Sequence, residues 1–344
     1  KKKKKKNERI RVISQENKGL VAARKAGVAT AHGNYTTFVD ADDWLECNMY
    51  EVMMGKALKE DADIVTSGCI LEYSSGSVVE IEQMEEGIYE GTKLREKFYP
   101  GMIGTDAFFL QNISIHVWNK IYKTDLIKCC INSIPDKITI GEDAACVYPA
   151  LLEAKRIAVI QEAFYHYRMT ETSMMGRNQQ YVESYKEVYR YMKERFMGYP
   201  YSFLNEQLKL LTIYELLLTS PQEFWRKQQG PFPYAGVRSG SRVVLYGIGR
   251  FGKLLKQQLE DTGWCKVVAL VDQNRKEDDS GLKCYSLEEF ISENVKYDYI
   301  LLSILKRNIC KSIIEKMITA GIAAEKIKQP DLMTIKKYEL ELEL

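Results

Sequence analysis

Carboxylate side chains follow a predicted strand early in this 344-residue chain. The stretch Tyr35–Val39 is β-branched and aromatic, which predicts a buried strand, and the run Asp40-Ala41-Asp42-Asp43 follows it directly. Alternate residues of a strand point to the same side, so Asp40 and Asp42 are spaced to present two carboxylates together. Hard divalent cations such as Mg²⁺ or Mn²⁺ take such oxygen ligands and neutralise a diphosphate. The alternative is an acidic helix N-cap before Trp44.

The flanking residues make this pattern specific. Residues 19–27 are G-L-V-A-A-R-K-A-G, and residues 33–44 are G-N-Y-T-T-F-V-D-A-D-D-W. Together they resemble the G-L-S-x-A-R-N-x-G and G-x-Y-I-x-F-x-D-x-D-D segments of family 2 glycosyltransferases, with Lys25 where the family usually has Asn. The resemblance implies a GT-A fold, a UDP-sugar or other nucleotide-sugar donor, and a metal held by Asp42, with Asp40 facing either the metal or the donor ribose. The donor-binding residues that it implies are Arg24, Asp40, Asp42, Asp43 and Arg168, with Asp43 shaping the turn or binding the sugar.

Two further segments resemble the same family. Trp118-Asn119-Lys120-Ile121-Tyr122 is similar to its W-N-K-x-Y element, and Glu142-Asp143 to its E-D pair. By resemblance, Asp143 is the base that takes the acceptor proton in an inverting transfer, with Glu142 beside it. Trp118 and Asn119 are the implied acceptor-binding residues. The alternatives are a core position for Trp118 and, for the E-D pair, favourable acids in the first turn of a helix.

A third segment, Tyr165-His166-Tyr167-Arg168 followed by Thr172-Ser173-Met174, resembles an aromatic-Tyr-Arg strand and the segment after it. Arg168 is expected to hold the leaving diphosphate, or else to form a salt bridge at the strand end. His166 is expected to be packed or at the solvent edge.

The family's first strand and its acidic D-D-G-S type turn, which hold uracil and ribose, have no counterpart before residue 10. The sequence is therefore expected to be an N-terminally truncated member that lacks the first βαβ portion, with an unpaired sheet edge near Ile10–Ile13 and little or no transfer activity of its own.

Near the C-terminus, Gly247, Gly249 and Gly252 form G-x-G-x-x-G between the predicted strand Arg242–Tyr246 and a helix to Leu259. Asp272 ends the next strand, at the distance expected for a ribose ligand. The pattern predicts nucleotide binding in a small Rossmann-like domain. The alternative is that the glycines only permit close packing of strand and helix.

The elements that must position these residues alternate between strands and helices. The sequence predicts a fold of class α/β, with an incomplete GT-A domain at 1–178, a helical segment and linker at 179–235, and the Rossmann-like domain at 236–344. The predicted strands are 10–13, 35–39, 63–68, 156–161, 242–246, 267–271 and 299–304, with a hairpin at 70–81. The predicted helices are 20–31 with Gly33 as its C-cap, 49–59, 117–127, 142–153, several between 179 and about 225, and 313–320.

Composition narrows the partners. A net charge of +2 does not point to nucleic acid, and Lys1–Lys6 is expected to be a solvated tail, with an anionic surface as the alternative. The eight cysteines form no C-x-x-C pair, which favours reduced core thiols and a cytoplasmic protein. No apolar run is long enough to cross a bilayer. Peripheral contact with the inner face of the cell membrane and a homo-oligomer stay open.

The sequence thus predicts a glycosyltransferase that moves a sugar to a hydroxyl of a glycan or lipid-linked acceptor in bacterial surface polysaccharide biosynthesis. One alternative is a dinucleotide-dependent sugar-modifying oxidoreductase that uses the C-terminal glycines. The other is a non-catalytic nucleotide-binding protein, which follows from the missing donor-base portion.

Overall fold

The computed structural model describes residues 7, 9–74, 76–104, 111–169, 180–220, 224, 230–273, 282–305 and 307–338. The chain divides into two compact units, which are described separately. The first comprises 1–103 and 111–205, and the second 104–110 and 206–344. The expected helical segment after residue 179 is thus shared between the two units.

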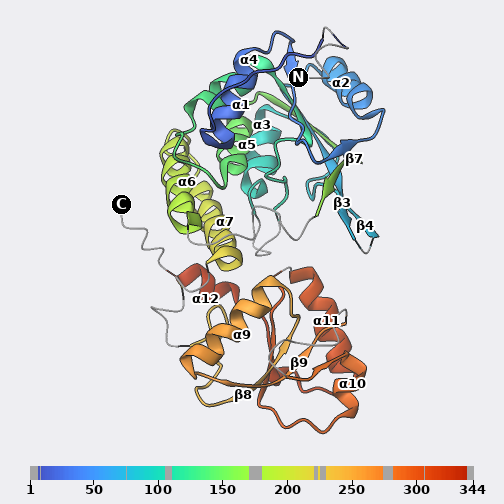
Figure 1. The fold of residues 1–344 in the computed structure, drawn as a ribbon, viewed down its shortest axis with the longest axis vertical. Helices are drawn as coiled ribbons and strands as arrows, with labels where there is room; N and C mark the ends of the chain where they lie inside the picture. The colour runs from blue at the N-terminus through green and yellow to red at the C-terminus, as the bar shows by residue number, and fades with distance from the viewer. Residues whose placement is uncertain are drawn as a thin grey trace. The chain divides into compact units, whose positions relative to one another are not determined.

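The first unit is a mixed sheet with helices on both faces (Figure 1). Within its described residues, seven strands pair in the order β1-β6-β3-β7-β2, with β4 beside β3 and β5 beside β7. β3 and β7 run parallel, and every other pair is antiparallel. The strands are β1 (Tyr35–Thr36), β2 (Trp44–Leu45), β3 (Ile64–Tyr73), β4 (Gly76–Glu80), β5 (Gly87–Glu90), β6 (Lys120–Lys123) and β7 (Arg156–Arg168).

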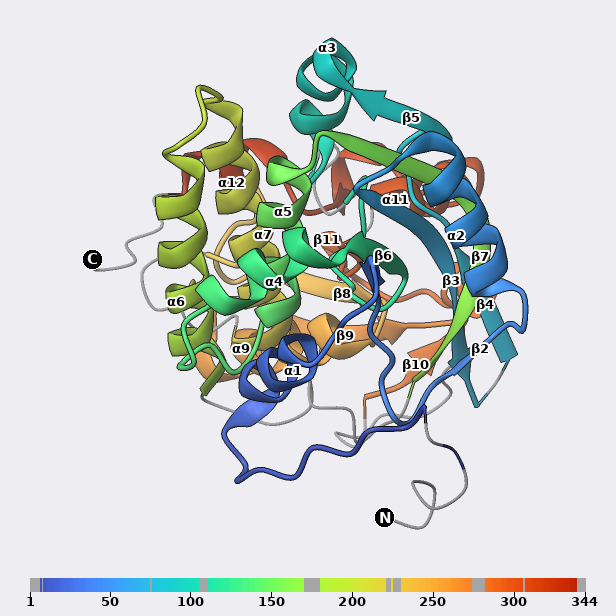
Figure 2. The ribbon, with the colours of Figure 1, turned by 90° about the horizontal axis from the view of Figure 1, so that it is seen from above.

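Helix α2 covers one face of this sheet, and α4, α5 and α6 lie on the other side of β3 and β7 (Figure 2). The apolar residues Met49 and Met53 of α2 are fully buried against Val65 of β3, which places the core between the helix and the sheet. The helices are α1 (Gly19–Ala29), α2 (Met49–Glu60), α3 (Gly91–Lys93), η2 (Leu94–Phe98), η3 (Tyr99–Gly101), α4 (Thr124–Ser133), α5 (Glu142–Glu153), α6 (Gln180–Phe196) and α7 (Phe203–Thr219), the last spanning the boundary of the units.

Several predicted elements differ from the observed ones. Residues 10–13 form no strand and are exposed, since no described strand pairs with them. The predicted helix 117–127 is wrong, because this stretch contains β6, which pairs with β3 and β1, and the helix begins only at Thr124. The predicted strand 35–39 is shorter and only partly buried, and α1 ends at Ala29 with Thr30 rather than Gly33 as its cap.

The second unit contains a parallel sheet. Its described strands pair in the order β10-β9-β8-β11-β12, with helices packed around them (Figure 1). Its elements are β8 (Arg242–Tyr246), α9 (Arg250–Thr262), β9 (Lys266–Val271), β10 (Cys284–Tyr285), α10 (Leu287–Ser292), β11 (Tyr299–Leu302), α11 (Arg307–Thr319), η5 (Ala324–Lys326), β12 (Ile327–Lys328) and α12 (Leu332–Lys337).

Two observations concern the cysteines and the apolar helices. All eight cysteines are described and free, and six of them are buried, which agrees with the predicted reduced core thiols. In the part of the chain that the structure describes, no helix has both the length and the apolar character needed to cross a membrane.

Candidate functional site

The predicted acidic residues form a turn between β1 and β2. The N–H of Asp43 donates to the Asp40 carbonyl over 3.3 Å, which closes the turn. Asp42 is exposed at its tip, and Asp40 and Asp43 are partly buried. The carboxylates are therefore presented by a turn that follows the short strand, and not by alternation along a strand as the sequence predicted.

Asp43 is fixed by bonds from β7. Its Oδ2 accepts from the hydroxyl of Tyr165 over 2.8 Å, and its Oδ1 accepts from the backbone N–H of Arg168 over 2.9 Å. Partial burial raises the pKa of Asp43 even though both bonds favour the ionised form. Both oxygens of Asp43 are thus engaged in holding the turn against β7.

Arg24 of α1 lies against the predicted catalytic pair. Its guanidinium is buried, donates to Glu142 Oε1 over 3.4 Å and forms a shorter ion pair with Asp143. Burial opposes the charge of Arg24, but Asp143 and Glu142 outweigh that effect and raise the pKa of the guanidinium. Arg24 was predicted to bind the donor, whereas here its charge is directed at the two carboxylates.

The pair Glu142 and Asp143 begins helix α5. Gly141, the N-cap, has φ +80°, and a Cβ there would lie 3.1 Å from the side chains of Tyr185 and Val188, so this position requires glycine. Acids in the first helical turn are favoured by the helix dipole. Burial, and then the neighbouring Asp143, raise the pKa of Glu142, with Arg24 opposing them. Arg24 thus pairs with both carboxyl groups, and burial keeps the pKa of Glu142 above its ordinary value in spite of that pairing.

The charges of Arg24 and Asp143 also affect Asp40. Burial raises the pKa of Asp40, Arg24 lowers it, and Asp143 is the next contributor. The first carboxylate of the turn, the buried guanidinium and the α5 pair therefore act on one another, although they are far apart in sequence.

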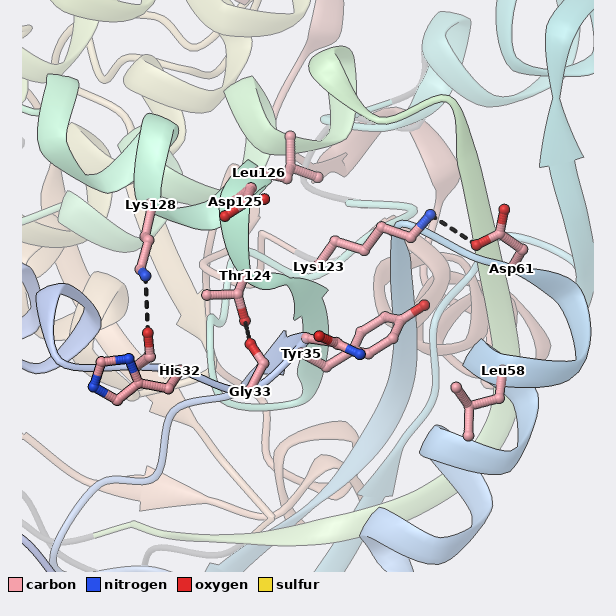
Figure 3. A pocket seen from close by; sticks show the side chains of 12 residues that line it. His32, Gly33, Tyr35, Leu58, Asp61, Lys123, Thr124, Asp125, Leu126 and Lys128 are labelled. Carbon is pink, nitrogen blue, oxygen red and sulfur yellow. Dashed lines mark hydrogen bonds and ion pairs between the residues drawn. The ribbon is translucent and has the colours of Figure 1, made fainter.

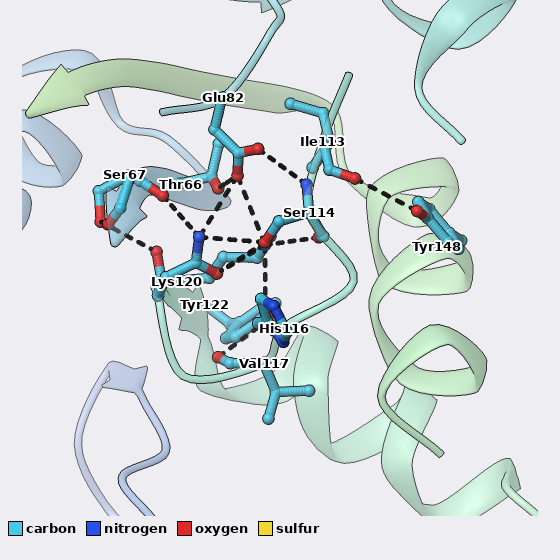
Figure 4. A network of polar contacts seen from close by, with 12 residues as sticks. Thr66, Ser67, Glu82, Ile113, Ser114, His116, Val117, Lys120, Tyr122 and Tyr148 are labelled. Carbon is cyan, nitrogen blue, oxygen red and sulfur yellow. Dashed lines mark hydrogen bonds and ion pairs between the residues drawn. The ribbon is translucent and has the colours of Figure 1, made fainter. Parts of the chain in front are cut away.

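The W-N-K segment is a buried polar network (Figure 4). Lys120 Nζ donates to the carbonyls of Ser114 and His116, each over 2.9 Å, and lies 3.6 Å from Glu82 Oε1. Burial lowers the pKa of Lys120, and Glu82 opposes that shift. Asn119, which is 1% exposed, donates to the Ser67 carbonyl. These contacts hold the loop 113–119 against β3.

The predicted acceptor-binding residues lie inside this framework. Trp118 is 2% exposed and stacks on Tyr165, with ring centroids 4.0 Å apart, and on His116 at 4.4 Å. Its surroundings are those of the core alternative, because stacked side chains and not solvent cover the indole. The side-chain amide of Asn119 donates to the Ser67 carbonyl and to Glu82, so it is also engaged within the protein.

The end of β7 carries charged and aromatic side chains near the acidic turn. Arg168 is exposed, and its Cζ lies 5.3 Å from the Trp44 ring centroid. His166 stacks on the same Trp44 at 4.9 Å and bonds Glu72 over 2.7 Å and Glu46 over 3.0 Å, which agrees with the packed or solvent-edge position expected for it. The segment Thr172-Ser173-Met174, which the resemblance places after this strand, lies outside the described residues.

Sequence reasoning missed two residues that organise the site. Tyr165 bonds the acidic turn, and Glu82 is the buried partner of Lys120. A family motif draws attention to Tyr165 through its neighbours, but nothing around Glu82 signals burial, since it follows an exposed hairpin strand.

A separate cavity of about 690 Å³ is lined by residues 31–35, the end of α2 and the start of α4 (Figure 3). Its cations are already partnered: Lys123 Nζ lies 2.9 Å from both Asp61 and Asp63, and Lys128 Nζ donates to the Ala31 carbonyl over 2.8 Å. None of the acidic-turn residues lines this cavity. Because both lysines are already paired, the cavity has little free charge to offer a ligand.

The glycine motif of the second unit forms a tight turn after β8. Gly247 has φ +95°, and a Cβ on Gly252 would lie 2.0 Å from the Gly247 carbonyl oxygen. Gly249 caps helix α9, and a Cβ there would meet nothing within 4 Å. Asp272 Oδ2 accepts from the N–H of Ile248 over 2.7 Å. Two of the glycines thus serve strand–helix packing, and the predicted ribose ligand bonds the turn.

The acidic turn offers oxygen ligands of the kind that divalent cations take. Among the described residues, no group of three or more Asp, Glu, His or Cys side chains is suited to hold a metal by itself. The exposed Asp42 and the partly buried Asp40 instead offer one or two carboxylates. This is how proteins usually bind Mg²⁺ together with substrate phosphates.

Comparisons with known proteins find similarity to glycosyltransferases. Residues 1–117 match the model of Glycosyl transferase family 2. The chain is similar to Glycosyltransferase GlyA of Streptococcus pneumoniae serotype 4, with 29% identity over 169 residues, which are 48% of this chain and 23% of that protein. It is similar to Putative glycosyltransferase EpsH of Bacillus subtilis, with 28% identity over 173 residues, which are 50% of this chain and 48% of that protein. The chain therefore spans less than half the length of these relatives.

A solved structure has a related fold. S. aureus TarS 1-349 in complex with UDP-GlcNAc matches with a TM-score of 0.50 and 19% identity, over 66% of this chain and 62% of that one. At this identity the likeness concerns the fold alone, and it confirms the predicted GT-A architecture.

Proposed function

We propose, from the premise that the N-terminal part of this chain belongs to glycosyltransferase family 2, that the protein transfers a sugar from a nucleotide-sugar donor to a hydroxyl group. The observation that carries the proposal is the exposed Asp42, on a turn whose Asp40 and Asp43 both bond Tyr165, together with the effect of Arg24 and Asp143 on the pKa of Asp40. A diphosphate site and a proton acceptor side by side are what such a transfer needs.

The proposed reaction is inverting. The acceptor hydroxyl attacks the anomeric carbon, a new C–O bond forms there, and the bond to the diphosphate breaks on the opposite face. The carboxylate of Asp143 takes the hydroxyl proton, and the nucleoside diphosphate leaves with the bonding electrons. Glu142 assists by holding a proton next to Asp143, and Arg24 keeps Asp143 in place.

We assign Asp42, and Asp40 behind it, to Mg²⁺ or Mn²⁺ in the presence of the donor. When bound, such an ion supplies positive charge that stabilises the leaving diphosphate. Exposed Arg168, which has its side chain over Trp44, supplies a second cation for the same phosphates.

A UDP-sugar is the first donor to test, since TarS, which shares the fold, was crystallised with UDP-GlcNAc. We propose a glycan or lipid-linked acceptor, in bacterial surface polysaccharide biosynthesis at the cytoplasmic face of the membrane. The names of the relatives support glycosyl transfer.

Binding of UDP in the presence and absence of Mn²⁺ tests the proposal by calorimetry. Asp42→Asn keeps the size of the side chain and removes its charge. We expect at least tenfold weaker metal-dependent binding of UDP, because one of at most two protein ligands is lost. Asp125→Asn, at an exposed aspartate in the first turn of α4, is the matched control and should leave binding unchanged. Equal affinity of wild type and Asp42→Asn would contradict the assignment.

A second candidate function concerns residues 236–344. The parallel order β10-β9-β8-β11-β12 has β8 at its centre, where ligands bind at the strand ends of Rossmann-like sheets. Nucleotide binding there is supported by this order and opposed by the bond of Asp272 to Ile248. A calorimetric titration with NAD tests this function. Binding would support a nucleotide site, and no binding would support a purely structural turn.

A further inference from the structure

Tyr165 connects the two ends of the acidic turn through one oxygen atom. Its hydroxyl accepts the backbone N–H of Asp40 over 3.0 Å and donates to Asp43 Oδ2 over 2.8 Å. The hydroxyl thus uses its acceptor and donor functions on the first and last carboxylate residues of the turn. Asp42, the proposed metal ligand, lies between these two anchored positions.

Tyr165 is held by its backbone, which pairs with strands on both sides, and by its ring, which stacks on Trp118. Tyr165 is fully buried, and its backbone lies opposite Leu45 of β2 and Cys69 of β3. Its ring stacks on Trp118 with a centroid distance of 4.0 Å and an angle of 17°. The hydroxyl is therefore presented by a rigid side chain, and its position is set by packing rather than by solvent.

Trp118 in turn belongs to the loop held by the Lys120 network. Lys120 is fully buried and bonds two carbonyls of the segment just before Trp118. The chain of contacts runs from the W-N-K loop through Trp118 and Tyr165 to the acidic turn. Supporting contacts of this kind are what hold a binding group within a fraction of an ångström of its productive position.

We propose that Tyr165 is a positioning residue that presents Asp40 and Asp42 to a cation bound with a nucleoside diphosphate. The inference rests on the proposed function for the nature of the ligand. The positioning of the turn by itself rests only on the two hydrogen bonds and the stack.

Tyr165→Phe removes the hydroxyl and keeps the ring stacked on Trp118. Tyr167→Phe is the matched control, because Tyr167 is two residues along the same strand and also contacts Trp118, with centroids 5.3 Å apart. Hydrogen exchange at the Asp40 amide reports on the turn without reference to any ligand. We expect faster exchange of this amide in Tyr165→Phe and wild-type exchange in Tyr167→Phe.

Affinity for Mn²⁺ in the presence of saturating UDP tests the consequence for binding. We expect a roughly tenfold weaker apparent affinity in Tyr165→Phe, the range for loss of a hydrogen bond to a charged group. If Tyr165→Phe does not fold, Asp43→Ala removes the carboxylate that accepts from the Tyr165 hydroxyl, and weaker Mn²⁺ affinity is the expected change.

The outcomes separate the two proposals. Wild-type exchange and wild-type Mn²⁺ affinity in Tyr165→Phe would overturn the role of Tyr165 and leave the proposed function standing. Wild-type protein that binds no UDP with Mn²⁺ would overturn the proposed function, and the proposed role of Tyr165 toward a cation with it. Faster exchange combined with weaker Mn²⁺ binding, in Tyr165→Phe only, supports the inference.

Discussion

Replacing Arg24 by Met should destabilise the first unit and make its stability depend more strongly on pH. The side chains of Arg24, Glu142 and Asp143 are only 8%, 11% and 15% exposed. The substitution keeps the length of the side chain but leaves two neighbouring carboxyl groups without their cation. Removing one partner of a buried ion pair costs about 3–5 kcal/mol, because an uncompensated buried charge remains.

The pH dependence follows from Glu142. Burial and Asp143 raise its pKa, and Arg24 lowers it, so loss of Arg24 raises it further. A carboxyl whose pKa is higher in the folded than in the unfolded protein binds more protons when folded. Its contribution therefore destabilises the fold progressively as pH rises from the unfolded value of about 4.3 through the folded one. The loss in free energy of unfolding caused by Arg24→Met should therefore be larger at pH 8 than at pH 5.5.

Urea unfolding, followed by tryptophan fluorescence at both pH values, measures this deficit. Lys25→Met is the control, because Lys25 is adjacent on α1 but its charge pairs with Asp136, whose side chain is 71% exposed, and it also donates to the Ile134 carbonyl. A surface pair of this kind contributes about 1 kcal/mol or less. Equal losses in the two variants, or a deficit for Arg24→Met that shrinks as pH rises, would refute the assignment of Arg24 as the buried counter-charge.

Two further predictions concern other parts of the chain. Partial burial lowers the pKa of His166, but the two carboxylates that flank it outweigh burial and raise it above the ordinary value of 6.5. The contribution of protonated His166 to stability is then complete below pH 6.5 and is lost as pH rises through the folded pKa. His166→Asn should therefore lower Tm more at pH 5.5 than at pH 9. An equal fall in Tm at both pH values would contradict this reasoning. In the second unit, Gly252→Ala should cost more than the roughly 1–3 kcal/mol of ordinary overpacking, since its Cβ would lie 2.0 Å from a backbone oxygen. Gly249→Ala, with φ −71° and open space around the Cβ, should cost about 1 kcal/mol or less in the same thermal unfolding experiment, and similar costs for both would show that the turn is not tightly packed.

Local patterns in the sequence were enough to predict the elements that depend on neighbouring residues. The helices at 49–59 and 142–153 were predicted within one residue of α2 and α5, and the strand 242–246 coincides with β8. Their apolar spacing and end residues act over a few positions, so no tertiary information was needed. The resemblance of residues 19–44 to family 2 glycosyltransferases could be recognised for a similar reason, because the motif is continuous in sequence, and residues 1–117 match the model of that family.

Errors arose where distant segments decide the structure. Residues 120–123 form a strand because β3 and β1 supply its hydrogen-bond partners, while residues 10–13 have no described partner and form none. The side chains of these segments are compatible with more than one backbone structure. The backbone partners that make a segment a strand come from elsewhere in the chain.

The roles of the charged residues were also decided by the tertiary structure. Arg24 meets Asp143 across 119 positions, and Tyr165 meets Asp43 across 122. A motif identifies which carboxylates belong to a site, but it cannot say which of them is free for a ligand. That depends on whether packing brings a donor or a counter-charge against each one, and here packing engages Asp43 and Asp143 and leaves Asp42 exposed.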